Sequence, residues 1–350
     1  MTNTTTVMGQ ERPYEPSWID RFKKWVENLP VRAWIFYVVS GLVLIAVQIL
    51  FLGLEGGLPA VEILPVIIFN GLFTPFLLAL MHFLDKQAVA ALNAMRPTLD
   101  MTAPQFDRFR YMLAHMPGRA ALASGLIMLV MAVLMERLWV TPVRYAALEQ
   151  LPLFTIVFHI IDKSSAFLFG VLIYHTIRQL RLVNAINAQY IRLNLFNLGP
   201  LRAFSRLTAS TAVGLLVGVY GWLLINPELL ADPLILGLAG FITITAVAVF
   251  AWPLVGVHRL MELEKERMLQ ALDQHFEAAF AQFDQGLRGG DTPLIEKLNG
   301  TIASLEIQHR KISAIPTWPW QPETARLVLS AIALPLILTI LQFLAVRAFD

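Results

Sequence analysis

The chain has 350 residues, of which 57% are hydrophobic and only 15% are charged, and its formal net charge is +2. Soluble domains carry about 25% charged residues, so this composition excludes an ordinary soluble protein. The chain has no cysteine, which excludes disulfides, thiolate metal sites and cysteine nucleophiles.

Seven apolar runs follow one another along the chain. Each is about 20 residues or longer, enough for a helix to cross a hydrocarbon core of ~30 Å. We therefore predict an all-α polytopic membrane helix bundle with about seven transmembrane helices. The runs lie at Ala33–Leu54, Val61–Leu84, Ala120–Trp139, Phe154–His175, Leu207–Ile225, Leu234–Val257 and Ala325–Val346.

Lysine and arginine lie mostly on alternate sides of these runs. They are frequent before the first run and in the second, fourth and sixth connections, whereas residues 54–60 and 226–233 contain none. Basic residues favour the cytoplasmic side of a membrane, so we predict the cytoplasmic (inner) membrane with the N-terminus inside and the C-terminus outside. Because the basic residues follow this sidedness, they predict no nucleic-acid partner.

The segment before the first run has the pattern of an amphipathic helix. Its apolar residues recur at helical spacing, and Lys23, Lys24 and Glu27 lie on the other side. One interpretation is a helix on the inner membrane surface, with interfacial anchors at Trp18 and Trp25. The other is a helix packed on the protein's own inner loops. The apolar positions are Trp18, Ile19, Phe22, Trp25, Val26 and Leu29.

Ionisable residues are concentrated in the fourth run, at His159, Asp162 and Lys163. They share one helix face, and ionisable groups inside a membrane suggest function. In one interpretation Lys163 reaches toward the outer boundary and pairs with Asp162, or with Glu136 or Glu149. In the other, the three residues line an internal cavity or proton path.

Two further patterns concern the helices themselves. Ser210, Gly214 and Gly218 form a stripe of small residues, which predicts close helix packing within the monomer or across a dimer. Histidines at the inner ends of two runs, His82 and His175, could be axial haem ligands. Helix-end histidines at an interface are more often surface residues, and we predict no cofactor and no metal.

The sixth run continues into a charged helix, and a second helix follows it. Apolar residues then recur at steps of three and four, which is typical of a coiled-coil seam, at Leu269, Leu272, Phe276, Ala279 or Phe280, Phe283 and Leu287. The Gly/Pro-rich segment 286–293 interrupts the helix, with Thr292 as the expected N-cap. We predict a cytoplasmic antiparallel hairpin, either closed on itself or serving as a dimerisation or signalling stalk. Its candidate interaction surface comprises Leu269, Leu272, Phe276 and Phe283, and the second helix carries Leu294, Leu298, Ile302, Leu305 and Ile312.

The chain returns to the membrane through a segment with three prolines, which exclude a regular helix. Trp318 and Trp320 are predicted anchors at the inner interface, and the last helix is expected to begin at about Glu323. The predicted organisation is a cytoplasmic segment (1–32), a six-helix transmembrane region (33–257), the hairpin with its return (258–322) and a seventh transmembrane helix (323–350).

Five short segments, 14–18 (YEPSW), 174–181 (YHTIRQLR), 197–201 (NLGPL), 205–208 (SRLT) and 315–320 (IPTWPW), resemble a family of uncharacterised multi-pass membrane proteins of bacteria and archaea. The resemblance covers most of the chain. The resemblance implies a polytopic membrane protein and brings no activity, ligand or catalytic residue.

The sequence contains no phosphate-binding loop, zinc-protease helix, serine-nucleophile elbow or kinase signature, so we expect no enzyme. The leading hypothesis is a membrane-bound assembly, scaffold or signalling component whose hairpin builds a homo-oligomer or membrane complex, with the lipid bilayer as its other partner. The alternative is a channel or secondary transporter whose polar path uses His159, Asp162 and Lys163.

Overall fold

The fold is that of a computed structural model, which describes residues 13–57, 63–138, 150–191, 195–196, 199–225, 233–320, 322–333 and 337. Within these residues the regular elements are helices. Six of them are long and apolar enough to cross a membrane, so a multi-pass membrane protein is confirmed. They are α2 (Ala33–Leu54), α3 (Leu64–Met95), α5 (Gly118–Leu138), α7 (Pro152–Tyr190), α8 (Gly199–Ile225) and α9 (Pro233–Gly289).

The seventh predicted span lies largely outside the described residues. A helix covers residues 322–333, one residue earlier than the expected start at Glu323. The described part of this helix is too short to cross a membrane by itself.

Small residues let neighbouring helices approach closely. A Cβ atom added at Gly170 of α7 would lie 2.5 Å from the Ser124 carbonyl oxygen of α5. On α8, a Cβ at Gly214 would lie 2.6 Å from Leu80, and one at Gly218 would lie 3.2 Å from Phe73, both on α3. The predicted small-residue stripe therefore packs inside the monomer, where absent side chains allow close helix contact.

Two helices continue beyond the length of a membrane span and build an extension of the bundle. At 1.5 Å per residue, the 32 residues of α3 and the 39 residues of α7 give lengths of about 48 and 58 Å. Their distal halves pack with α4 (Ala103–Ala114). A capping box opens α4, because the Thr102 hydroxyl accepts from the Gln105 N–H. The core of this extension includes Leu92, Met95, Phe106, Leu113 and Ile186.

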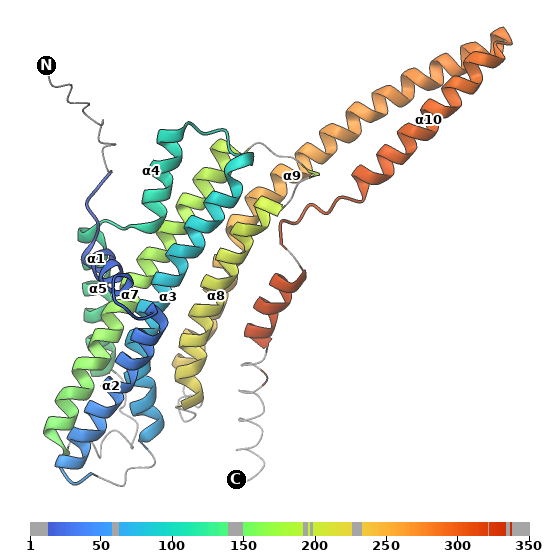
Figure 1. The fold of residues 1–350 in the computed structure, drawn as a ribbon. Helices are drawn as coiled ribbons and strands as arrows, with labels where there is room; N and C mark the ends of the chain where they lie inside the picture. The colour runs from blue at the N-terminus through green and yellow to red at the C-terminus, as the bar shows by residue number, and fades with distance from the viewer. Residues whose placement is uncertain are drawn as a thin grey trace, which may run out of the picture.

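The short helix α1 (Trp18–Glu27) lies across the bundle beside α5 and α7, below α4 in Figure 1. It begins with a capping box in which Ser17 and Asp20 exchange hydrogen bonds. Because both hydrogen bonds join residues that are only three positions apart, the local sequence determines where α1 begins.

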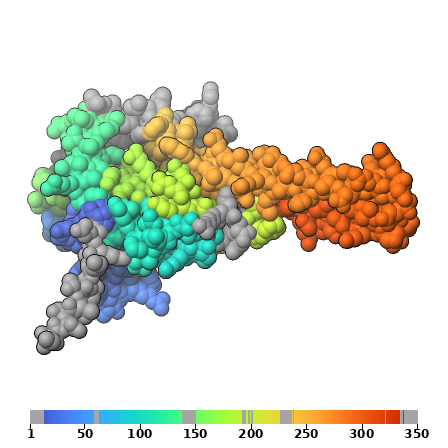
Figure 2. Space-filling view, turned by 90° about the horizontal axis from the view of Figure 1, so that it is seen from above, coloured from blue at the N-terminus to red at the C-terminus, as the bar shows by residue number. Residues whose placement is uncertain are grey.

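The most extended part of the molecule is an arm that we define as residues 258–313. It comprises the distal part of α9 and all of α10 (Thr292–Ser313), which run antiparallel and project away from the bundle (Figures 1 and 2). The 57 residues of α9 give a length of about 86 Å. Gly290, with φ of 70°, makes the turn, and the N-cap of α10 is Asp291 and not the expected Thr292, because the Asp291 carboxylate accepts from the Leu294 N–H.

The predicted non-helical return holds the base of the arm. Trp318 stacks on His258 with ring centroids 3.8 Å apart, and Trp320 stacks on Trp318 at 4.2 Å. Lys265 donates to the carbonyl oxygens of Ser313 (2.6 Å) and Ile315 (2.9 Å), and so caps the end of α10. These contacts join the arm to the return, and the two predicted indole anchors take part in them.

Candidate functional site

The ionisable residues predicted on the fourth run form a half-exposed cluster between α5 and α7. Lys163 lies 2.8 Å from Asp162 and 2.7 Å from Glu136, and His159 lies 3.3 Å from Glu136. The side chains of His159, Glu136 and Asp162 are 43%, 41% and 38% exposed. The expected pairing of Lys163 with Asp162 and Glu136 is therefore present on the flank of the bundle. Glu149 lies outside the described residues.

We call His159, Asp162, Lys163 and Glu136 the outer cluster. Its position along α5 fits a membrane boundary. Glu136 lies 18 residues after Gly118 on α5, or about 27 Å along the helix. A hydrocarbon core of ~30 Å that starts at the Gly118 end would finish close to Glu136. At such a boundary the charged side chains of the cluster can pair with one another, and Lys163 can extend toward water.

Among the described residues, the other polar contacts inside the bundle do not join into a path. The Asn70 amide donates to Gln48 (3.1 Å) and to the Phe158 carbonyl oxygen (3.2 Å). Thr74 and Ser165 are 2.6 Å apart, with either as the donor. Between the Thr74–Ser165 contact and the next polar groups on α3, the core consists of the buried side chains of Leu77, Met81, Leu168 and Leu172.

A second ionic cluster, which the sequence did not predict, lies under α1. The Lys23 ammonium pairs with Asp20 (2.9 Å) on its own helix and with Asp85 of α3. Asp20 also accepts the Met116 backbone N–H at 3.0 Å, and Asp85 accepts the Gln179 side-chain amide at 3.2 Å. The side chains of Lys23, Asp20 and Asp85 are only 6%, 2% and 9% exposed. We call these three residues the buried triad.

Asp20 and Lys23 keep their charges because their partners outweigh burial. Burial alone would raise the pKa of Asp20, but Lys23 and the Met116 N–H hold that pKa below its usual value. Burial would likewise lower the pKa of Lys23, yet Asp85 and Asp20 together raise it. Both shifts favour the charged forms, so the triad is an ionic joint between α1, α3 and the start of α5.

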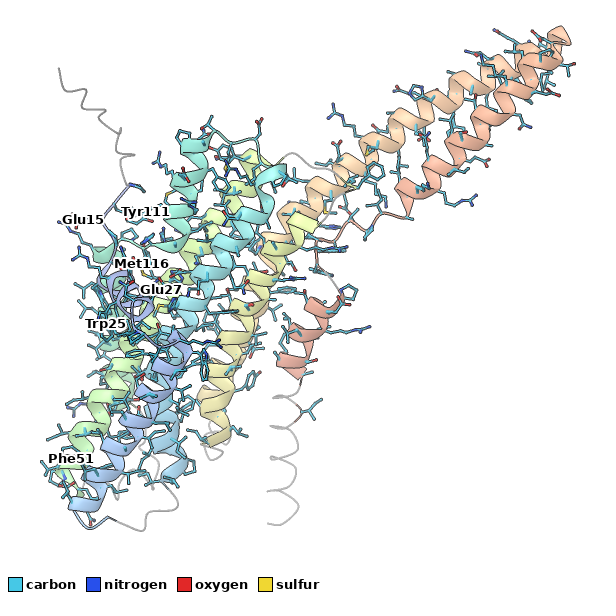
Figure 3. The ribbon with its side chains drawn as sticks, viewed as in Figure 1. Glu15, Trp25, Glu27, Phe51, Tyr111 and Met116 are labelled. Atoms are coloured by element: carbon cyan, nitrogen blue, oxygen red, sulfur yellow. The ribbon has the colours of Figure 1, made fainter. Side chains whose placement is uncertain are left out.

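The prediction for Lys23 is corrected by this geometry. Helical periodicity put Lys23 on the solvent side of α1, whereas its side chain lies with Ile19 and Val26 on the face that packs against the bundle. On this face α1 therefore packs against the protein itself. Trp18 and Trp25 lie on the other side, 41% and 51% exposed, and Figure 3 labels Trp25 on α1.

Both histidines that were interpreted as surface residues are buried. The His82 Nε2–H donates to Glu27 (2.9 Å), and the Nδ1 atom lies 3.0 Å from the Tyr37 hydroxyl. The His175 side chain is 0% exposed, and its Nε2 atom lies 3.1 Å from Asp85. Each histidine faces a carboxylate that sequence spacing could not assign, and these contacts add to the joint under α1.

The tyrosine just before α1 extends the joint toward α4. The Tyr14 hydroxyl donates to the His115 carbonyl oxygen (2.8 Å), and Tyr111 donates to the Tyr14 carbonyl oxygen (2.7 Å). The Arg178 guanidinium lies over the Tyr14 ring, 5.4 Å from its centroid, and donates to the Tyr14 hydroxyl. Residues 14–27 are thus attached to α3, α4 and α7 along their whole length.

In the arm, the predicted interaction surface is the seam between the two helices. Leu272 is buried against α10 together with Ala279, while Leu269, Phe276 and Phe283 are partly buried. On α10, Leu298 and Ile312 are buried, and Phe276 meets His309 edge-on at 6.5 Å. The seam therefore closes inside the hairpin and leaves little of Leu272 for a partner.

Other apolar side chains of the arm remain accessible. Phe280 is 51% exposed, Leu287 is 55% exposed and Ile307 is 53% exposed. The structure thus moves the candidate interaction surface from the seam to the outside of the arm. The repeat in the sequence contained Phe280 and Leu287, but it could not tell which members face α10.

No match was found when the chain was compared with protein-family models, with curated proteins and with solved structures, so the family resemblance of the sequence has no match to support it.

Proposed function

We propose that the protein is a non-enzymatic membrane component that assembles with a partner through its projecting arm. The observation that carries this proposal is the contrast within the arm: its seam is closed, yet Phe280 and Leu287 are more than half exposed on its outside. A two-helix hairpin that only returned the chain to the membrane would need neither a projection of this length nor large apolar groups in water.

The attachment of the arm supports the same role. Helix α9 runs without interruption from the membrane-length segment into the arm, and the stack of Trp318 on His258 holds its base. A continuous helix with a clamped base presents its outer surface in a defined direction. This suits a scaffold or a signalling component, in which the position of the docking surface matters.

We further propose the topology that the lysine and arginine distribution favours. In it, the protein lies in the cytoplasmic membrane, α1, α4 and the arm lie in the cytoplasm, and residues 325–346 form a seventh span. The arm would then be available to cytoplasmic proteins and to the cytoplasmic parts of other membrane proteins.

A channel or transporter that uses His159, Asp162 and Lys163 has less support from the geometry. These residues lie on the flank of the bundle and are partly exposed. The buried side chains of Leu77, Met81 and Leu172 separate the polar contacts of the bundle from the buried triad. A polar path would have to open this apolar layer.

The size of the complex solubilised from native membranes tests the proposal. We expect the wild-type protein to migrate in a discrete complex larger than its monomer, and the double variant Phe280→Ser with Leu287→Ser to migrate as the monomer. The control is Leu126→Ser with Val130→Ser on the exposed face of α5, which should leave the complex intact. A wild-type monomer, or a complex that survives the arm variant, would contradict an assembly role for the arm.

A further inference from the structure

One flank of α9 in the arm carries a regular seven-residue repeat on its surface. Eight positions follow one another at alternating steps of three and four, and all eight are exposed. Such spacing places them in one stripe along the helix, as in the contact face of a coiled coil. We call this stripe the acidic flank; it consists of Leu263, Glu266, Gln270, Asp273, Glu277, Phe280, Asp284 and Leu287.

The acidic flank combines exposed apolar side chains with carboxylates that have no partner within the described part of the chain. Three apolar side chains, Leu263, Phe280 and Leu287, are between 51% and 63% exposed. The carboxylates between them are Glu266, Asp273, Glu277 and Asp284, and none of the four has an ion pair within the described part of the chain. Lys23 and Lys163, by contrast, each lie between two carboxylates.

The other exposed flank of the same helix is different. Its middle part presents small or neutral side chains at Ala271, Gln274, Ala278, Ala281 and Gln285, and its two ends carry the exposed Arg267 and Arg288. Between residues 268 and 289, exposed carboxylates and large exposed apolar side chains coincide on the acidic flank only.

The charge of the arm also changes along its length. Residues 268–306 carry six acidic groups and two basic ones, whereas the base, 258–267 with 307–313, carries five basic groups and three acidic ones. A basic base suits an anionic membrane surface, and an acidic outer part is repelled from that surface. The outer part of the flank is therefore held in the aqueous phase, away from lipid.

We propose that the acidic flank docks a basic amphipathic helix of a partner protein. This inference rests on the proposed function and names the chemistry of the partner. The apolar stripe of such a helix would cover Phe280 and Leu287, and its lysines or arginines would pair with Asp273, Glu277 and Asp284. Opposite charges across the contact would set the register and accelerate association.

A second copy of the chain fits this flank poorly. A two-fold contact uses the same surface on both subunits. Whether the helices ran parallel or antiparallel, the carboxylates of one copy would face the carboxylates of the other, and like charges in a contact are unfavourable. The acidic flank therefore selects a partner of opposite charge.

Two peptides and the full-length protein in nanodiscs test the inference. The first peptide is a labelled helix of about 21 residues, or three heptads, with leucine at the a and d positions and lysine beside them. The second has glutamate in place of lysine. We expect fluorescence anisotropy to show binding of the lysine peptide, at least about tenfold weaker binding of the glutamate peptide, and weaker binding at higher salt.

Variants locate the binding on the flank. Two double variants should each weaken the binding of the lysine peptide by about tenfold. Asp273→Asn with Glu277→Gln removes the charge pairing, and Phe280→Ser with Leu287→Ser removes the apolar anchors. The control Glu296→Gln with Glu306→Gln on α10 changes the net charge by the same amount and should weaken binding less than about twofold.

Several results would overturn the inference: equal binding of the two peptides, an equal effect of the α10 control, or no binding at all. A concentration-dependent doubling of mass that Phe280→Ser with Leu287→Ser abolishes would replace the basic partner by a second copy. If the peptides fail while the native complex still depends on Phe280 and Leu287, the partner chemistry is wrong and the assembly role stands. If the native complex also forms without Phe280 and Leu287, both the inference and the assembly role of the arm are wrong.

Discussion

The bundle and the arm treat their charged and apolar side chains in opposite ways. In the bundle, Lys23 lies between Asp20 and Asp85, and Lys163 lies between Asp162 and Glu136. On the outside of the arm, Asp273, Glu277 and Asp284 show no ion pair among the described residues, and Phe280 is half exposed. Groups that are paired within the chain stabilise it, whereas groups that the chain leaves unpaired are available to another molecule.

The largest effect is expected where the pairing is most buried. Lys23→Met leaves Asp20 and Asp85 close together with no cation between them, and breaking a buried ionic cluster costs about 3–5 kcal/mol. We expect a markedly lower midpoint of thermal unfolding in detergent. Lys24→Met, at the exposed neighbouring position, should leave the midpoint unchanged. Equal midpoints for the two variants would show that the triad adds nothing to stability.

Within the arm, the seam and the outer flank should respond differently. Leu272→Asp puts a carboxylate into the buried seam and should cost the arm at least about 2 kcal/mol, because it removes a buried leucine. Phe280→Asp changes an exposed position and should cost less than about 0.5 kcal/mol. Limited proteolysis of residues 268–306 distinguishes the two. Equal protection of both variants would mean that the seam does not hold the hairpin together.

Close helix contact in the bundle gives a smaller effect. Gly170→Ala would place a Cβ atom 2.5 Å from the Ser124 carbonyl oxygen, so α5 and α7 must separate, at a cost of about 1–3 kcal/mol. Gly240→Ala on α9 meets nothing within 4 Å and should be neutral or stabilising by up to ~1 kcal/mol. Thermal unfolding of the two variants in detergent compares them directly, and a stabilised Gly170→Ala protein would refute the close contact.

Acid should release α1 from the bundle. The pKa of Asp20 is lowered in the folded protein, so its contribution is complete above the unfolded value of 3.8 and is lost as the pH falls below that value toward the folded pKa. Because the chain has no cysteine, spin labels can be placed at Lys24→Cys and Arg108→Cys alone. We expect one distance between α1 and α4 down to about pH 4, and a broadened distribution at lower pH. Asp20→Asn should broaden it at neutral pH, and a distance that stays narrow in that variant would argue against the joint.

The smallest effect is expected at the outer cluster. Lys163→Met removes the same kind of cation as Lys23→Met, but its partners are about 40% exposed. Exposed ion pairs contribute roughly 0–1 kcal/mol, so the unfolding midpoint should fall only slightly. A decrease in the unfolding midpoint as large as that of Lys23→Met would show that the outer cluster lies in a more buried environment than its exposed fractions of about 40% indicate.

Patterns that extend over a few residues predicted much of the fold. The run Ala33–Leu54 coincides with α2, and both the extension of the sixth run into a longer helix and the break within residues 286–293 are present. Hydrophobic length, cap chemistry and turn residues are local properties, so a single sequence reveals them. The start of α10 was misplaced by one residue because Asp291 and Thr292 can both serve as N-caps.

Long-range pairing could not be predicted in the same way. Helical periodicity assigned Lys23 to solvent because the pattern of α1 does not contain Asp85, which lies 62 residues later. The same limit applies to His175, whose partner Asp85 is on another helix. In the arm, the repeat contained Phe276 and Phe280 together, and only the packing of α10 decides that Phe280 faces outward.

The most direct test of the arm as a docking element is photocrosslinking in living cells. A photoreactive phenylalanine derivative at position 280 lies on the outer flank of the arm, and the same group at Arg108 lies on the exposed surface of α4. We predict a discrete adduct of higher mass from position 280, absent from position 108 and lost when Asp273→Asn and Glu277→Gln are added. No adduct at position 280, or the same adducts from both positions, would contradict the claim that the arm is where this protein meets its partner.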